Sequence, residues 1–184
     1  ARYRSALAAL ALLGVTCALA VPALNGLSRD SRAIGALHEI GHAVGQARDF
    51  AVRERTRVTL CAKDNASALR CGTSIRDLSN GWILYAERDG HSGLAADPPS
   101  CTETRGTRQD CLVAASGQSG QAIRWFSGQR DVRAFSIKSN GRPATRGEFV
   151  LCSMDGAKRH RSLAVSATGR VGGVHQLSRL HRCA

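Results

Sequence analysis

Hydrophobic residues follow two different patterns in the first third of the chain. Residues 5–24 contain no charged side chain, and about 20 mainly apolar residues are needed for a helix to cross a bilayer. Farther along, apolar residues recur at helical spacing with charged residues between them. These positions are Leu24, Leu27, Ile34, Leu37, Ile40, Val44, Ala47 and Ala51. The pattern predicts one long helix over roughly residues 3–55, transmembrane over 5–24 and amphipathic afterwards.

The flanks of the apolar segment predict its orientation. Arg2 and Arg4 precede it, and positive charge stays on the cytoplasmic side of a membrane, so the rest of the chain is expected outside. Pro22 is expected to kink the helix rather than end it. A cleavable signal peptide, cut after Ala18-Leu19-Ala20, is the alternative. The absence of an initial Met and the helical pattern beyond that cut argue against it.

Beyond Arg57 the pattern changes to short strand-like runs separated by Gly, Asn, Asp and Ser. The predicted strands are Val58–Cys61, Trp82–Tyr85, Cys111–Ala115, Ala122–Phe126, Val132–Lys138, Glu148–Cys152, Ser162–Ser166 and Arg170–His175. Ser139-Asn140-Gly141 and Thr168-Gly169 predict turns, and residues 87–110 predict a long loop. The expected fold class is therefore α+β: a helical part over 1–56 whose second half packs on an antiparallel β-sheet in a head over 57–184.

Six of the seven cysteines lie in the predicted head, and the seventh, Cys17, lies in the apolar segment. An even set of cysteines in an exported chain indicates disulfides, with 15 pairings open to six of them. Local spacing suggests Cys61–Cys71 and Cys101–Cys111, which leaves Cys152–Cys183. Because the chain has no C-x2-C pair, a zinc–thiolate site is disfavoured.

Positive charge is concentrated in the second part of the chain. The formal net charge is +12, and residues 105–184 hold fourteen Lys and Arg against four acidic residues. Such an excess favours polyanionic partners, although solubility alone is the simpler explanation. The basic residues proposed to contact DNA are Lys158, Arg159, Arg161, Arg170, Arg179 and Arg182. Contact of this kind would be electrostatic and independent of base sequence.

The order of these segments resembles type IV pilins and pseudopilins, and specifically minor pilins of the GspH/FimT type. The stretches that carry the resemblance are Ala20-Val21-Pro22, Gln46-Ala47-Arg48, Ala51-Val52-Arg53, Arg57-Val58-Thr59-Leu60-Cys61, Asn80-Gly81-Trp82-Ile83-Leu84-Tyr85, Phe135–Arg142, Glu148–Cys152 and Leu163–Val171. The resemblance covers nearly the whole chain except residues 87–130. No single stretch is specific, whereas their order and spacing together are.

The resemblance implies a structural subunit with no cofactor and no enzymatic activity. Its helix would pack against other pilin subunits, and a peptidase would expose Ala1 as the mature amino terminus, open to N-methylation. Before assembly the chain would sit in the inner membrane as a single-pass protein with its head in the periplasm. It would then enter an extracellular type IV pilus or a periplasmic type II secretion pseudopilus, and minor pilins of the FimT kind are linked to DNA capture during natural transformation.

Two positions depart from the family pattern. The family has Phe first and Glu fifth, whereas this chain has Ala1 and Ser5. The Glu is thought to neutralise the amino terminus of a neighbouring subunit, and an unpaired buried charge is costly. Ser5 therefore suggests a position at the filament tip, where no neighbouring terminus needs a partner.

The sharpest competing motif is His38-Glu39-Ile40-Gly41-His42, an H-E-x-x-H sequence on the predicted helix. In zinc proteases two His at this spacing bind the metal and the Glu activates water. A catalytic zinc needs a third protein ligand, and Arg48 stands where the longer protease pattern has His. A membrane-anchored zinc protease with His38 and His42 as ligands is thus the alternative, and flank positions of an amphipathic helix are the simpler interpretation.

Overall fold

Each of the eight predicted strand-like runs contains a strand in the folded chain. The computed structural model describes residues 3, 31–75, 77–88, 98–104, 106–127, 134–152, 160–177 and 183. The predicted transmembrane segment, Ala1 and Ser5 lie outside these residues. Within the described ranges, no helix combines the length and the apolar character that a membrane span requires.

The amphipathic helix covers residues 31–54 and buries one face. Leu37, Ile40 and Val44 are at most 2% exposed, as the helical spacing of the apolar residues predicts. The helix ends where Arg55 adopts a positive φ of 52° and the Thr56 N–H donates to the Ala51 carbonyl at 3.2 Å. This is a Schellman-type ending, in which the left-handed position is usually Gly.

The strands form two four-stranded antiparallel sheets. Their bounds are β1 Arg57–Ala62, β2 Trp82–Glu87, β3 Cys111–Ala115, β4 Ile123–Ser127, β5 Phe135–Ile137, β6 Gly147–Leu151, β7 His160–Val165 and β8 Val171–Leu177. The first sheet has the order β3-β2-β1-β5 and the second has the order β4-β6-β7-β8. The expected α+β class is correct, but the single sheet that the sequence suggested is divided in two. The division arises because β5 pairs with β1, whereas β4 on one side of it in sequence and β6 on the other pair with each other.

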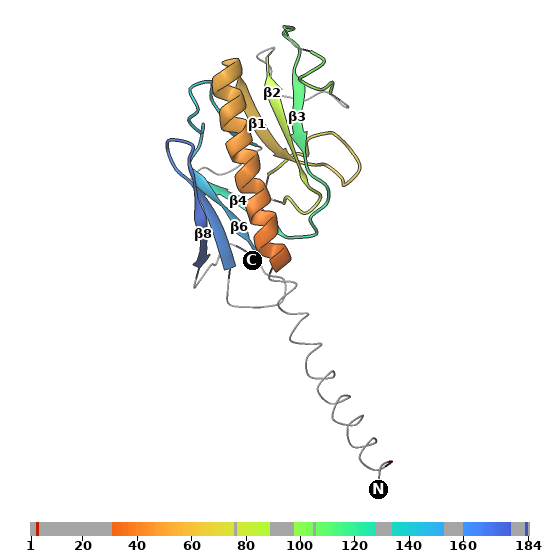
Figure 1. Cartoon of the computed structure of the whole chain (residues 1–184), viewed down its shortest axis with the longest axis vertical. Coiled ribbons are helices and arrows are strands. Elements are labelled where there is room, and N and C mark those ends of the chain that lie inside the picture. The colour runs from red at the N-terminus through yellow and green to blue at the C-terminus, as the bar shows by residue number, and fades with distance from the viewer. Residues whose placement is uncertain are drawn as a thin grey trace. The chain divides into compact units, whose positions relative to one another are not determined.

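The helix is held against both sheets, which lie on either side of it in Figure 1. Its carboxyl end is tied to β2 because the Thr56 hydroxyl donates to the Glu87 carbonyl at 2.6 Å. Nearer its start, a side chain at Gly41 would come within 3.5 Å of Leu163 in β7 and Val171 in β8. Residues Ala36–Ala184 accordingly form one compact unit that includes most of this helix.

Three aromatic rings join the two sheets. Trp125 in β4 lies 4.8 Å from Phe135 in β5 and 4.5 Å from Phe149 in β6, between ring centroids. All three side chains are at most 4% exposed. Tilted pairs at these distances add to the stabilisation from apolar burial. Three of the chain's eight aromatic residues therefore take part in the contact between the sheets.

Three disulfides staple the head: Cys61–Cys71, Cys101–Cys111 and Cys152–Cys183. Local spacing suggested the first two pairs and left the third. Their Cα–Cα distances of 5.6, 4.8 and 5.6 Å are normal for disulfides. The first two close short loops beside the first sheet, and the third ties the end of β6 to the carboxyl-terminal residues.

Candidate functional site

The H-E-x-x-H motif lies on the exposed face of the helix. His38, Glu39 and His42 are all exposed, opposite the buried face that carries Leu37 and Ile40. In the described part of the chain, no three His, Cys, Asp or Glu side chains gather where a metal ion could bind. The spacing of the two histidines therefore reflects an exposed helical stripe, and the zinc protease interpretation finds no support here.

The six basic residues proposed to contact DNA are only partly described. Lys158, Arg159, Arg179 and Arg182 lie outside the described residues. Arg161 is half-buried in β7 opposite Gln176, and Arg170 is exposed at the turn between β7 and β8. At about 3.3 Å per residue, four residues of strand separate Arg161 from the turn end of the hairpin by about 13 Å. The fold does not bring these two arginines together.

Arg170 belongs to one of two turns that have the same geometry and lie side by side. The first turn comprises residues 138–142, after β5, and the second comprises residues 166–170, between β7 and β8. In the first, the N–H of Lys138 donates to the Arg142 carbonyl at 2.9 Å; in the second, the N–H of Ser166 donates to the Arg170 carbonyl at 2.9 Å. Each turn has a Gly with φ of 76° directly before its Arg, a left-handed position that Gly occupies at least cost.

The two turns touch each other although they belong to different sheets. A Cβ atom on Gly169 would lie 2.3 Å from the carbonyl oxygen of Gly141, closer than such atoms approach in proteins. Gly is therefore required at position 169 for two reasons: the contact leaves no room for a side chain, and φ is positive. The contact brings Arg142 and Arg170 to neighbouring positions at the surface, where both side chains are exposed.

Arg48 of the helix packs beneath both turns. Its side-chain atoms would lie 3.3–3.5 Å from a Cβ atom on either Gly141 or Gly169. Its Nε is buried and has no hydrogen-bond partner among the described residues. The aliphatic stem of an Arg commonly covers apolar or backbone surface in this way while its charged end extends outward. Arg48 therefore adds positive charge to the place where the turns meet.

A surface cavity of about 310 Å³ lies beside the first turn and is lined mainly by polar side chains. Its lining residues are Lys138, Asn140, Arg142, Pro143, Ala144, Arg146 and Ala167. Sequence analysis missed Lys138, Arg142 and Arg146 as site residues. The signal available in the sequence was the repeated Gly-Arg after each predicted turn, at Gly141 and Gly169, but nothing in the sequence showed that the turns meet.

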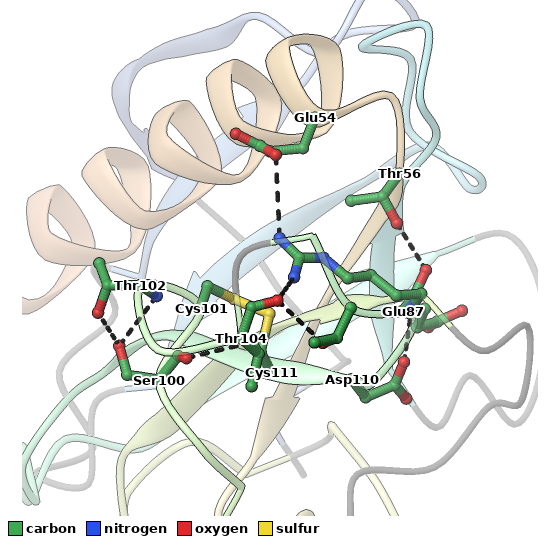
Figure 2. The surroundings of a disulfide bond; sticks show 11 residues. Glu54, Thr56, Glu87, Ser100, Cys101, Thr102, Thr104, Asp110 and Cys111 are labelled. Atoms are coloured by element: carbon green, nitrogen blue, oxygen red, sulfur yellow. Dashed lines mark hydrogen bonds and ion pairs between the residues drawn. A yellow bond between two sulfur atoms is a disulfide. The ribbon is translucent and has the colours of Figure 1, made fainter.

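A second cavity, of about 180 Å³, lies between the helix end and the Cys101–Cys111 disulfide, and its charges are paired (Figure 2). Arg88 lies 3.9 Å from Glu54 of the helix and donates to the Thr104 carbonyl at 2.8 Å. The backbone N–H of Arg88 donates to Asp110 at 2.6 Å. The Arg88 side chain is 11% exposed and connects the helix with the end of β2 and the Cys101–Cys111 loop. The charges in this region therefore have a structural role.

An amphipathic helix clasped by two disulfide-stapled antiparallel sheets defines a pilin-like head domain. The sequence model of the family described as Type II transport protein GspH matches residues 36–169. The chain belongs to this family, the GspH/FimT-type minor pilins. The family consists of structural pilins rather than enzymes, and its members associate with other pilin subunits.

Solved structures show the same fold. The type IV minor pilin FimU of Pseudomonas aeruginosa strain PAO1, crystallised in space group P65, is similar with a TM-score of 0.52 at 17% identity, covering 82% of this chain and 98% of that chain. A second crystal form of FimU, in space group P21, gives a TM-score of 0.51 at 17% identity and covers 79% of this chain and 90% of that chain. No curated protein sequence matches the chain.

Proposed function

We propose that this chain is a minor subunit of a type IV pilus or a type II secretion pseudopilus, anchored in the inner membrane through residues 5–24 before assembly. The observation that carries the proposal is the helix over 31–54, which the head clasps on one face only. The uncharged segment that precedes it in sequence is then available to the bilayer and, after assembly, to neighbouring subunits. The likeness to FimU and the family assignment support this proposal.

The anchor and the incorporation into a filament are tested together in the organism that encodes the chain. Photo-crosslinkers placed at positions 10 and 13 within the apolar segment should capture other pilin subunits, and a crosslinker at Glu39 on the exposed helix face serves as the comparison. Mass spectrometry of the native protein should find Ala1 as its amino terminus. A terminus at Val21, together with protein free of membranes and filaments, would show a secreted protein and refute the proposal.

A position at the filament tip is the finer part of this proposal, and Ser5 supports it. Since Ser5 cannot pair with the amino terminus of a neighbour as Glu does, packing within the shaft would leave a buried charge unpaired. Immunogold labelling should find the chain at filament ends, and Ser5→Glu should allow it to enter the shaft. Even labelling of the unmodified chain along shafts would exclude the tip position.

The head is further proposed to contact DNA through its basic surface, without reading base sequence. The support is the charge excess of residues 105–184 and the exposed Arg170. Binding in a gel shift should weaken steeply with salt, because each neutralised phosphate releases counterions. It should also weaken when Arg159, Arg161 and Arg170 are replaced by Ala. Binding that does not depend on salt concentration, or no binding at all, would refute this part of the proposal.

A further inference from the structure

The cavity beside the first turn, at residues 138–142, carries positive charge that the described part of the head does not neutralise. Lys138, Arg142 and Arg146 line it, and none of the described residues in its lining is acidic. In the described ranges, none of these three side chains forms an ion pair with a carboxylate. By contrast, the head pairs Arg57, Arg70 and Arg88 with carboxylates elsewhere.

The placement of two of these cations opposes the stability of the hairpin itself. The backbone N–H of Lys138 bonds to the Arg142 carbonyl, so the two residues lie opposite each other across the hairpin. Like charges in directly opposite positions destabilise antiparallel pairs. An anion that bridges the two side chains would therefore stabilise this hairpin.

We infer that this cavity is a phosphate-binding site and that its ligand is the sugar–phosphate backbone of a nucleic acid. The inference rests on the proposed DNA contact of the head. It places that contact at residues that the sequence did not single out. A guanidinium group donates two parallel hydrogen bonds to a phosphate, and an ammonium group adds a point charge. Arg142, Arg146 and Lys138 supply both kinds of donor at one cavity.

The site is held rigid by the fold, which lowers the entropy lost on binding. Hydrogen bonds from Gly141 to Lys138 at 2.8 Å and from Ala144 to Ser136 at 2.8 Å fix the hairpin. The Asn140 side chain accepts a hydrogen bond from the Arg142 N–H at 3.1 Å. Arg48 and the second turn, at residues 166–170, support the first turn from the helix side. Arg170 is exposed on that second turn, which contacts the first turn through Gly169 and Gly141, and so adds a further positive charge near the cavity.

The lining of the cavity favours the backbone of a nucleic acid over its bases and over a lipid surface. Among the described residues that line it, no aromatic side chain offers a surface on which a base could stack. Exposed large hydrophobic side chains, which would insert into a bilayer, are limited in the described residues to Tyr3 and Val52. A soluble polyanion bound through phosphates alone fits both observations.

The test compares single-charge variants of the purified full chain. The probes are inorganic pyrophosphate, followed by calorimetry, and a fluorescent 20-nucleotide single strand of mixed sequence, followed by anisotropy. Arg142→Gln removes a charge from the cavity. Arg108→Gln is the matched control, because Arg108 is also exposed and precedes β3, at the opposite edge of the first sheet from β5. Arg142→Lys keeps the charge and removes the paired donors.

We expect Arg142→Gln to weaken binding of both probes about tenfold and to lower the salt slope for the oligonucleotide by about 0.7. Arg142→Lys should recover part of the affinity, and Arg108→Gln should leave it within about twofold. Fluorescence of the buried tryptophans would show that each variant is folded. Equal losses with Arg142→Gln and Arg108→Gln would mean that net charge alone acts and would overturn the inference, as would no binding of either probe.

Two further measurements separate this inference from the proposals on which it rests. Vesicles containing 30% phosphatidylglycerol should not bind in an Arg142-dependent manner; if they do and the oligonucleotide does not, the nucleic-acid ligand is wrong. Incorporation of Arg142→Gln into filaments should equal that of the unmodified chain. Normal incorporation with no phosphate binding would refute the site alone, whereas phosphate binding by a chain that never enters filaments would refute the filament role alone.

Discussion

Gly169→Ala is expected to destabilise the head strongly, because the substitution affects both the conformation of a turn and its contact with another turn. Gly169 has φ of 76°, and an L-residue in the left-handed region costs about 1–2 kcal/mol. The added Cβ would also lie 2.3 Å from the Gly141 carbonyl oxygen. Forcing extra volume into such a contact costs a further 1–3 kcal/mol or so. The free energy of unfolding should therefore fall by about 2–5 kcal/mol.

Two other glycines separate these contributions. Gly106 also has a positive φ, of 84°, but a Cβ atom added there would meet no other atom within 4 Å, so Gly106→Ala should cost only the conformational 1–2 kcal/mol or so. Gly173 in β8 has open space and no left-handed conformation. Gly173→Ala should be neutral or stabilise by up to about 1 kcal/mol, because Ala restricts the unfolded chain.

The assay is urea unfolding with the disulfides oxidised, followed by the fluorescence of Trp82 and Trp125, which are only 7% and 4% exposed. For a chain of this size, the expected loss at Gly169 corresponds to a decrease in Tm of about 4–20 °C. The decisive comparison is between Gly169→Ala and Gly106→Ala. If the two cost the same, the carbonyl of Gly141 does not contact Gly169, and the meeting of the two sheets at these turns is refuted.

Three further predictions concern other parts of the head. Arg55→Gly should stabilise by about 0.5–1 kcal/mol in the same urea assay, because Arg55 holds a φ of 52° where Gly is usual; a loss of stability would contradict the assigned helix end. Burial, followed by the nearby charges of Glu87 and Asp110, raises the pKa of Tyr85 from 10.0 to about 12. A raised pKa favours the neutral phenol in the folded state, so stability should be lost as pH rises from about 10 to 12, by about 2–3 kcal/mol in total, and Tyr85→Phe should flatten that part of the pH profile. Replacing Cys152 and Cys183 together by Ala should cost about 3.7 kcal/mol, against about 2.7 kcal/mol for either disulfide with a separation of 10 residues, because the separation of 31 restricts the unfolded chain more; equal unfolding midpoints would contradict this order.

The positions of the strands could be predicted from the sequence because the signals for them are local. The runs at Trp82–Tyr85 and Cys111–Ala115 are rich in apolar residues and are bounded by turn-forming residues, which places a strand without reference to the rest of the chain. Observed strands β2 and β3 begin at the same residues. The buried stripe of Leu37, Ile40 and Val44 could likewise be predicted, because helical spacing alone determines which face is apolar.

Strand pairing and the basic cavity could not be predicted in this way. The partner of β5 is β1, which lies more than seventy residues earlier, and the sequence of Phe135–Ile137 suits either sheet equally well. The cavity depends on that pairing, because the pairing of β5 with β1 places the first turn next to the second. The sequence therefore directed attention to the dense run of basic residues at 158–161, whereas Lys138, Arg142 and Arg146 are spaced apart along the chain and gather only in the fold.

The location of the uncompensated charges suggests that stability and binding can vary separately in this head. Lys138, Arg142, Arg146 and Arg170 lie in turns or beside strand ends and are exposed, so each can be neutralised without opening a cavity in the core. The core contacts that join the sheets come from Trp125 and its aromatic neighbours, which carry no charge. The exposed cations and the core are connected through Gly141, Gly169 and Arg48. These residues hold the two turns together, while the arginines that follow the glycines are exposed. Neutralising the turn cations should thus lower ligand affinity without a loss of stability, whereas substitutions at Gly169 should lower both. This difference distinguishes a binding surface built on the turns from one that depends on total charge.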